Sequence, residues 1–275
     1  MVSGEGFQPV KSADRTLEVL EALAASGRRR SLVDLARSLD IPKSSLHGIL
    51  RTMMQRGWVE VDDNGSRFGL GVRALQVGAA YLETDDTVSL LAGVLDDLSQ
   101  QFGETVHLGR LDGPYVVYVA KRESVHPLRL YSAIGRRLPA HATALGKVLL
   151  AERADDAVGA VLTWPLAALT SHTIANPDAL YADLAAIRER GYAIDNQENT
   201  EGLVCFAVAA PLHSPAVDAV SVSVPVARLD PGVEERIVAA LRRSVGQLSA
   251  ARGLLSDQPS PGRYRDVVGP GRPGS

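Results

Sequence analysis

The chain has 275 residues, which is long enough for two domains of ordinary size, each with its own core. Its single cysteine, Cys205, excludes an internal disulfide framework and any zinc site that needs several cysteines, and it suits a reducing compartment. The net charge of −3 argues against a protein that coats nucleic acid through an overall basic surface. No apolar run is long enough to cross a membrane and the first ten residues do not resemble a signal peptide, so we expect a cytoplasmic protein without a membrane partner.

Positive charge is concentrated near the N-terminus. Residues 26–57 contain seven basic and two acidic residues, so this segment is electropositive within an acidic chain. Three of the basic residues form the run Arg28, Arg29 and Arg30, and such a run taken alone is most often a solvated loop. Local charge therefore directs attention to the segment without assigning it a function.

Three short helices are predicted in and around this segment. Apolar residues at helical spacing indicate a first helix over residues 12–25, which Gly27 ends. A second begins after Ser31 as N-cap and stops at Asp-Ile-Pro. The third begins near Lys43, and its buried stripe has the spacing i, i+3, i+4, i+7: Leu46, Ile49, Leu50 and Met53. Two short helices joined by a tight turn predict a helix-turn-helix.

The opposite face of the third helix carries small and hydrogen-bonding groups, which suit phosphates and base edges in a major groove. Hydroxyl groups stand at its N-terminus, where free N–H groups and the helix dipole favour a phosphate. Two strand-like runs follow at 58–61 and 66–70, and the Asn-Gly between them predicts a hairpin, which in this position is a wing. The candidate DNA contacts are Lys43, Ser44, Ser45, His47, Gly48, Arg51 and, in the wing, Arg67.

Each of these features has a plainer interpretation. The polar face of an amphipathic helix is often merely solvated, and Ser-Ser pairs often only cap. The order helix, helix, turn, polar helix and hairpin within about sixty residues favours a winged helix-turn-helix over a simple helical module. A winged-helix adaptor that binds protein in place of DNA remains an alternative.

The rest of the chain alternates helical and strand-like patterns. Helices are predicted over 71–83, 88–101, from near Thr143, and over 177–190, where Gly191 ends the last one. Strands are predicted at 105–111, 115–120, 204–212 and 217–226. The predicted class is α+β, with helices packed on a mostly antiparallel sheet.

Motifs recur along most of the chain. Residues 32–36 read LVDLA, 41–47 IPKSSLH, and 56–60 RGWVE; later segments read GETVHL at 103–108, LPAHATALGK at 138–147, GYAID at 191–195 and GLVC at 202–205. These resemble the DNA-binding and sensor domains of IclR-type regulators, and the string HATALGK is the most specific of them. The resemblance implies a winged helix-turn-helix at 8–70, a linking helix at 71–84 and a GAF-like effector-binding domain at 85–253. Residues 254–275, rich in Pro, Gly and Arg, predict a disordered tail.

The resemblance also implies a function. It indicates a DNA-binding transcription regulator and favours a repressor over an activator. Such a regulator is expected to bind near-palindromic operator DNA as a homodimer or as a dimer of dimers, that is, a homotetramer. A small-molecule effector would control binding, with small carboxylates, sugar acids and aromatic acids as candidate classes. The family pocket lies between segment 128–146 and the last strands, and the matching residues are Leu128, Leu130, Tyr131, Ala144, Leu145, Asp195, Cys205, Ser221 and Ser223.

The residue types suit such a pocket. Ser221 and Ser223 are two apart in a strand, so both hydroxyls point to one face, and the first N–H groups of the helix at 144–145 add donors for an anion. A solvated strand face and a merely buried cysteine are the alternatives. The chain departs from many relatives at Gly48 and at Val204, where arginine is common.

An enzyme is the competing class. Cys205 with His107, His141 or His213 would form a nucleophile and base, and Asp195 would orient the base. The sequence has no Gly-x-Ser-x-Gly elbow, no phosphate-binding glycine loop and no metal-ligand spacing. We therefore expect no catalytic residue, no metal and no cofactor.

Overall fold

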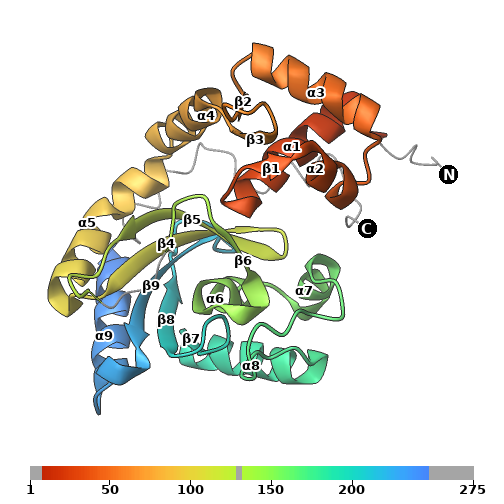
Figure 1. Cartoon of the computed structure of the whole chain (residues 1–275). Helices are drawn as coiled ribbons and strands as arrows, with labels where there is room; N and C mark the ends of the chain where they lie inside the picture. The colour runs from red at the N-terminus through yellow and green to blue at the C-terminus, as the bar shows by residue number, and fades with distance from the viewer. Residues whose placement is uncertain (1–7, 128–131, 248–275) are drawn as a thin grey trace. The chain divides into compact units, whose positions relative to one another are not determined.

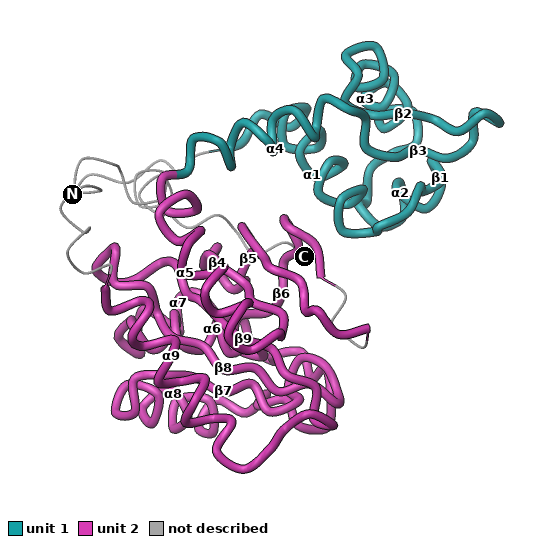
Figure 2. The backbone as a smooth tube through the Cα atoms, turned by 90° about the vertical axis from the view of Figure 1, so that its left-hand side faces the viewer, with its two compact units in different colours: residues 1–85 teal, residues 86–275 magenta. Residues whose placement is uncertain are grey.

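The structure, a computed structural model, describes residues 8–127 and 132–247. The predicted tail at 254–275 and the predicted apolar wall of Leu128, Leu130 and Tyr131 lie outside the described residues. The chain divides into two compact units, residues 1–85 and 86–275 (Figure 2).

Over its described residues, the first unit has three helices packed with a small sheet, and a fourth helix follows them (Figure 1). Its helices are α1 (Lys11–Ser26), α2 (Leu32–Ser38) and α3 (Lys43–Gln55), followed by α4 (Val72–Glu83). Strands β2 (Val59–Val61) and β3 (Arg67–Leu70) form the predicted hairpin, and β1 (Arg30–Ser31) adds an unpredicted third strand, in the order β1-β3-β2. Both strand pairs are antiparallel.

Local signals fix the helix ends in this unit. Gly27 takes the left-handed conformation, with φ of 59°, immediately after α1. The Ser31 side chain accepts a hydrogen bond from the N–H of Asp34 and so caps α2. The core of the unit is apolar and joins all three helices to the hairpin; it includes Val19, Leu35, Leu46, Leu50, Met53 and Phe68.

The second unit is built on a six-stranded sheet in the order β6-β5-β4-β9-β8-β7, and every neighbouring pair is antiparallel. The strands are β4 (Thr105–Asp112), β5 (Tyr115–Arg122), β6 (Arg137–Pro139), β7 (Ala193–Asn196), β8 (Leu203–Ala209) and β9 (Asp218–Pro225). The helices are α5 (Asp86–Phe102), α6 (Ala144–Ala151), α7 (Asp155–Val161), α8 (Pro177–Arg190) and α9 (Val233–Gly246), with 3₁₀ turns η1 (Ala140–Ala142) and η2 (Val226–Arg228).

Helices cover both faces of this sheet. Helices α5 and α9 contact one face, while α6 lies against the other and packs on α8 (Figure 1). A continuous apolar core between α6, α8 and the sheet includes Leu145, Leu149, Leu184, Ala207 and Ala219. The α+β class with an antiparallel sheet is therefore confirmed. The GAF-like label stays a prediction.

Several elements differ from the sequence prediction. Strand β8 ends at Ala209, not at Leu212, because the chain then turns and Leu212 donates its N–H to the carbonyl of Ala210 at 2.9 Å. The short elements β6, β7 and α7 were not predicted. Helix α9 was also missed, although its buried residues at 237, 238, 241 and 245 have helical spacing.

Candidate DNA-binding surface and effector site

Helix α3 exposes the residues that the sequence selected for DNA. Its buried side chains are Leu46, Leu50 and Met53, while Ile49 is half-buried. The opposite face is therefore open to solvent, and it carries Lys43, Ser44, Ser45, His47, Gly48 and Arg51. A Cβ atom added at Gly48 would meet no atom within 4 Å, so nothing in the described residues requires glycine there.

A carboxylate organises the wing. Asp62 Oδ1 accepts hydrogen bonds from the N–H groups of Ser66, at 2.8 Å, and Arg67, at 3.0 Å. These backbone hydrogen bonds lower the pKa of Asp62, so the carboxylate stays charged at neutral pH. Arg67 follows the turn as the first residue of β3, and its side chain is exposed.

The polar candidates for the effector site lie in register across the second sheet. Asp195 pairs with Cys205, Cys205 with Ser223, and Ser223 with Thr105, on four neighbouring strands. Paired residues of antiparallel strands share a face, as do residues two apart. Ser221 therefore lies on the same face, which is the face that packs against α6.

Burial determines the protonation of this row. The Cys205 thiol donates a hydrogen bond to Ser223 Oγ at 3.2 Å, and burial raises the pKa of the thiol well above its ordinary range. Asp195 Oδ1 accepts hydrogen bonds from the N–H groups of Glu198, at 2.7 Å, and Asn199, at 3.3 Å. Burial nevertheless raises the pKa of Asp195 to about 7. The row thus contains a neutral thiol beside a carboxyl group that titrates near neutrality.

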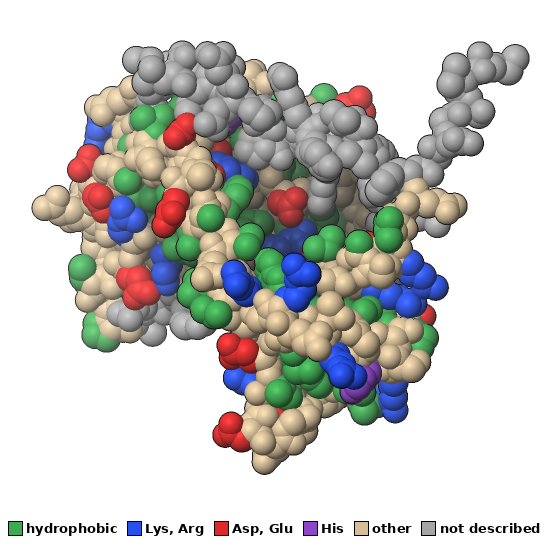
Figure 3. All heavy atoms as spheres, turned by 90° about the horizontal axis from the view of Figure 1, so that it is seen from above, with side chains coloured by type: hydrophobic (Ala, Val, Ile, Leu, Met, Phe, Trp, Pro, Cys, Tyr) green, Lys and Arg blue, Asp and Glu red, His purple; other side chains and the backbone are tan. Residues whose placement is uncertain are grey.

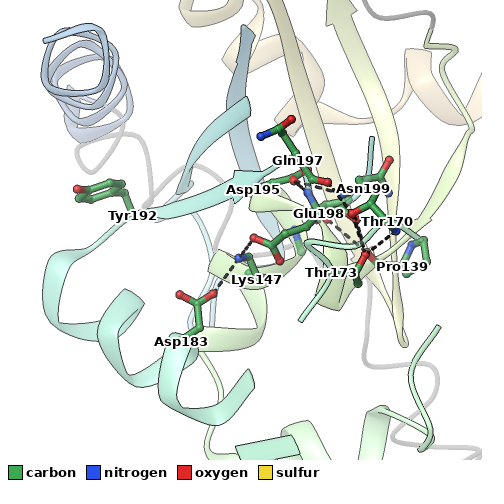
Figure 4. Close-up of polar contacts among 12 residues, drawn as sticks. Pro139, Lys147, Thr170, Thr173, Asp183, Tyr192, Asp195, Gln197, Glu198 and Asn199 are labelled. Atoms are coloured by element: carbon green, nitrogen blue, oxygen red, sulfur yellow. Dashed lines mark hydrogen bonds and ion pairs between the residues drawn. The ribbon is translucent and has the colours of Figure 1, made fainter. Parts of the chain in front are cut away.

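A buried ion-pair cluster lies next to Asp195 (Figure 4). Lys147 of α6 is 1% exposed, and its Nζ lies 2.6 Å from Glu198 Oε1 and 2.8 Å from Asp183 Oδ2 of α8. Glu198 also supplies an N–H to Asp195, so the cluster connects α6 and α8 with the polar row. Sequence motifs included Lys147, but its partners are 36 and 51 residues away and no local signal pairs them.

Helix α6 begins with a close backbone contact. A Cβ atom at Gly146 would lie 2.2 Å from the carbonyl oxygen of Ala140, so only glycine fits. Thr143 caps the helix by accepting the N–H of Gly146 at 3.0 Å. The N–H groups of Ala144 and Leu145 precede it in the same first turn, and both residues are buried.

His107 belongs to the motif at 103–108 and was predicted from the sequence as one candidate base for Cys205, not as an effector contact. It is fully buried, pairs in register with Ser221, and stacks on Tyr118 with 4.2 Å between ring centroids. Its Nε2 lies 2.8 Å from Ser132 Oγ, whereas its Nδ1 has no hydrogen-bond partner within residues 8–127 and 132–247. Burial lowers the pKa of His107 to about 3, so the imidazole is neutral.

The enzyme alternative requires a histidine hydrogen-bonded to Cys205, but His107 and His141 contact other groups. His141 donates from Nε2 to the carbonyl oxygen of Ala167 at 3.0 Å, and the polar side-chain contact of His107 is Ser132. In the parts of the chain that the structure describes, no hydrogen bond joins a histidine to Cys205. Those parts also contain no group of three or more His, Cys, Asp or Glu side chains able to hold a metal ion.

Comparison with known families matches both units. A profile described as the IclR helix-turn-helix domain matches residues 12–63. A second profile, described as the C-terminal part of the bacterial transcriptional regulator IclR, matches residues 79–250. The chain belongs to the IclR family. The resemblance seen in the sequence motifs is therefore confirmed.

Relatives of this IclR-family chain are transcriptional regulators. The HTH-type transcriptional regulator XynR of Escherichia coli K12 is 34% identical over 223 residues, which cover 80% of this chain and 88% of XynR. The transcriptional repressor IclR of the same strain is 32% identical over 224 residues, covering 80% and 82%. A solved IclR homologue of Microbacterium hydrocarbonoxydans, complexed with 4-hydroxybenzoate, has the same fold, with a TM-score of 0.72, 21% identity and coverage of 88% and 99%.

These findings identify a DNA-binding transcriptional regulator, and its relatives are regulators rather than enzymes. Among the described helices, none is long and apolar enough to cross a membrane.

Proposed function

We propose that this protein is a repressor whose binding to operator DNA is controlled by a small carboxylate, a sugar acid or an aromatic acid. The observation that carries the proposal is the row Asp195, Cys205 and Ser223, with Ser221 on the same buried face under α6. A few polar groups on an apolar face are typical of a small-ligand site. A repressor among the relatives supports repression, and a homologue bound to 4-hydroxybenzoate supports an acid as the ligand.

The groups around this row suit an acid. The hydroxyls of Ser221 and Ser223 and the first N–H groups of α6 donate to a carboxylate. Asp195, protonated below about pH 7, adds a further donor. Nδ1 of His107, which has no hydrogen-bond partner in the described part of the chain, lies on the same face, and we infer that it forms a hydrogen bond with a second polar group of the ligand. Leu128, Leu130 and Tyr131, outside the described residues, keep their proposed role as the apolar wall.

On the DNA side, α3 is the proposed recognition helix. Lys43, Ser44 and Ser45 at its start are proposed to meet phosphates, and His47 and Arg51 to reach base edges. Gly48 allows the helix backbone to approach the groove closely, and Arg67 extends the contact from the wing. All these side chains are exposed, as this role requires.

Helix α4 supports a homo-oligomer. None of its residues is buried, although it carries Val72, Leu75, Val77 and Tyr81, whose exposed fractions range from 49% to 71%. Apolar surface of this kind is typical of an interface. We propose that α4, in the predicted linker 71–84, meets a second copy of the chain, so that a dimer or a dimer of dimers binds a near-palindromic operator.

Control by an effector requires two arrangements of such an oligomer. The ligand must bind the DNA-free and DNA-bound arrangements with different affinity, because equal affinity would shift nothing. Ligand contacts with α6 and the sheet would be transmitted toward the linker.

The test uses the full-length protein and duplex DNA from its own upstream region. Binding is measured with acetate, gluconate, benzoate and 4-hydroxybenzoate as probes. Arg51→Ala is expected to weaken duplex binding about tenfold or more while the thermal shift by a probe acid is retained. Ser223→Ala is expected to retain duplex binding and to reduce the thermal shift by the probe acid.

Two results would overturn the proposal. If Arg51→Ala removed the response to acid as strongly as the binding of DNA, the division of roles between the units would be wrong. If the unmodified protein showed no sequence preference and no steep dependence on salt, the adaptor alternative would replace the regulator.

A further inference from the structure

The first unit contains a hollow lined by arginines, separate from the face of α3. Its volume is about 370 Å³, and its lining residues are Arg28, Arg29, Arg30, Asp34, Arg37, Ser38 and Arg67. The run at 28–30, which by itself predicts a solvated loop, therefore shares a concave surface with α2 and with the wing. Five of the seven lining residues are arginines and one is acidic.

Strand pairing assembles this hollow. Ser31 of β1 pairs with Arg67 of β3, so the segment at 28–30 enters beside the wing. The stem of Arg29 lies on the backbone of Gly69, where an added Cβ would be 3.0 Å from Arg29 Cγ. Because β1 has only two residues, the sequence pattern gave no sign of this pairing.

The acidic residue in the hollow is already engaged. Asp34 Oδ2 accepts the hydroxyl of Ser31 at 2.7 Å, and the same hydroxyl caps α2 by accepting the N–H of Asp34. Arg30 bonds the carbonyl oxygen of Asp34, at 3.2 Å, rather than its carboxylate. The carboxylate is therefore used in the helix cap and lies in no ion pair within 4 Å among the described residues.

The hollow holds more guanidinium groups than carboxylates. Arg29 Nη2 lies 3.7 Å from Glu60 Oε2 at an exposed position, where an ion pair contributes little to stability. Among the residues that the structure describes, Arg28, Arg37 and Arg67 form no ion pair with an acidic side chain, and all three are exposed. Asp34 is the one carboxylate among the seven lining residues, so the five guanidinium groups still leave a net positive charge, and an anion would relieve the repulsion among them.

The chemistry of the hollow favours a phosphate. Guanidinium groups present parallel N–H donors that match the oxygens of phosphate, and several converge here on one concavity that remains open to solvent. Arg67 belongs both to the hollow and to the wing, so a duplex lying along the wing brings its backbone to the same surface.

We propose that this arginine hollow, defined by the seven lining residues above, binds a phosphate of the DNA backbone that flanks the bases read by α3. The contact carries no sequence information and adds affinity equally to every duplex. The inference rests on DNA binding by the family and is independent of the effector site.

The test measures how duplex binding by the full-length protein depends on salt. Arg37→Gln and, separately, Arg28→Gln remove one charge from an exposed position of the hollow. One phosphate contact contributes about 0.9 to the slope of log K against log salt, so each variant is expected to lower the magnitude of the slope by a part of that amount, up to about 1. Affinity should fall by the same factor for the upstream duplex and for a scrambled duplex.

Arg243→Gln in α9 is the matched control, because it removes the same charge from an exposed position in the other unit. It is expected to leave the slope unchanged. Slopes of the two hollow variants equal to that of the control would overturn the proposal, as would a loss confined to the upstream duplex.

A free phosphate compound is the competing occupant. Calorimetric titration with inorganic phosphate and with pyrophosphate, without DNA, distinguishes it. Saturable binding that Arg37→Gln abolishes, together with an unchanged salt slope, would overturn the DNA assignment. An unmodified protein that bound no duplex at any salt concentration would contradict DNA binding itself, which tells that failure apart from failure of the hollow.

Discussion

Asp195 is the residue at which burial most clearly changes chemistry. Its carboxyl group is 3% exposed and accepts two backbone N–H groups, yet desolvation raises its pKa from 3.8 to about 7. Two charged neighbours act on it in opposite directions: Glu198 raises the pKa and Lys147 lowers it. Near neutral pH a small change in acidity therefore changes the charge beneath α6.

The sign of the effect on stability follows from the raised pKa. Between about pH 4 and pH 7 the folded protein holds a proton that the unfolded chain has lost, so Asp195 makes the free energy of unfolding fall as pH rises. The slope is at most about 1.4 kcal/mol per pH unit. Asp195→Asn cannot ionise and keeps an acceptor for the N–H of Glu198, so its stability relative to the unmodified protein is expected to increase from pH 5 to pH 7.

Urea denaturation of both proteins at pH 5, 6 and 7 checks this prediction. Because Glu198 and Lys147 are present in both, the difference between the two pH profiles isolates Asp195. Parallel profiles would show that Asp195 is ionised throughout this range.

At the scale of elements, two helical glycines differ in the space available for a side chain. Gly146 lies where α6 touches the backbone of Ala140, and an added Cβ would be 2.2 Å from that carbonyl oxygen. Gly48 lies on the exposed face of α3, where an added Cβ would meet no atom of the described residues within 4 Å. Helix propensity alone would favour alanine at both positions by about 1 kcal/mol.

We expect Gly48→Ala to raise the free energy of unfolding by up to about 1 kcal/mol, and Gly146→Ala to lower it by about 3 kcal/mol or more, because backbone must shift. Thermal and urea denaturation of the pair measure both effects. Equal effects of the two substitutions would mean that η1 and α6 separate at little cost. Duplex binding by Gly48→Ala would then report whether close approach of α3 matters.

At the scale of the whole molecule, the notable feature is apolar surface that a single chain leaves exposed to solvent. Helix α4 exposes Leu75 at 71% of its area, beside other apolar side chains that are also exposed. Apolar side chains are visible among charged ones on the face drawn in Figure 3. Exposure on a single helix, more than scattered exposure, is typical of an interface between subunits.

Leu75→Glu is expected to shift the protein toward the monomer mass of 29.2 kDa, because a charge would be buried in the proposed interface. Light scattering coupled to size exclusion measures the mass. The matched control is Leu169→Glu, at a leucine that is 45% exposed in the other unit and outside α4. If Leu75→Glu left the oligomer mass unchanged, the interface would not lie on α4.

Much of the fold was predictable because its signals are local. Gly27 and Gly191 end helices in the left-handed conformation, and Ser31 caps α2 within three residues. The Asn-Gly turn between β2 and β3 and the buried stripe of α3 are local in the same sense. Short strands such as β1 and β6 escaped prediction, because two or three residues carry no periodicity.

The candidate site divides in the same way. Sequence motifs selected Asp195, Cys205, Ser221 and Ser223 through family resemblance, but the register of β7, β8, β9 and β4 decided that three of them form one row with Thr105. Likewise, only the fold joined Lys147 to Asp183 and Glu198, and only the fold left Nδ1 of His107 without a hydrogen-bond partner among the described residues.

By itself, then, the sequence determined the helix-turn-helix, the wing and the class of the sheet, because caps, turns and periodicity act over a few residues, and its motifs indicated the family by resemblance. The tertiary structure alone decided which polar groups meet, how deeply they are buried and therefore how they titrate. It also brought the arginines of 28–30 beside Arg37 and Arg67. Desolvation and charge balance depend on neighbours far apart in the chain, and those neighbours are set by strand register and packing.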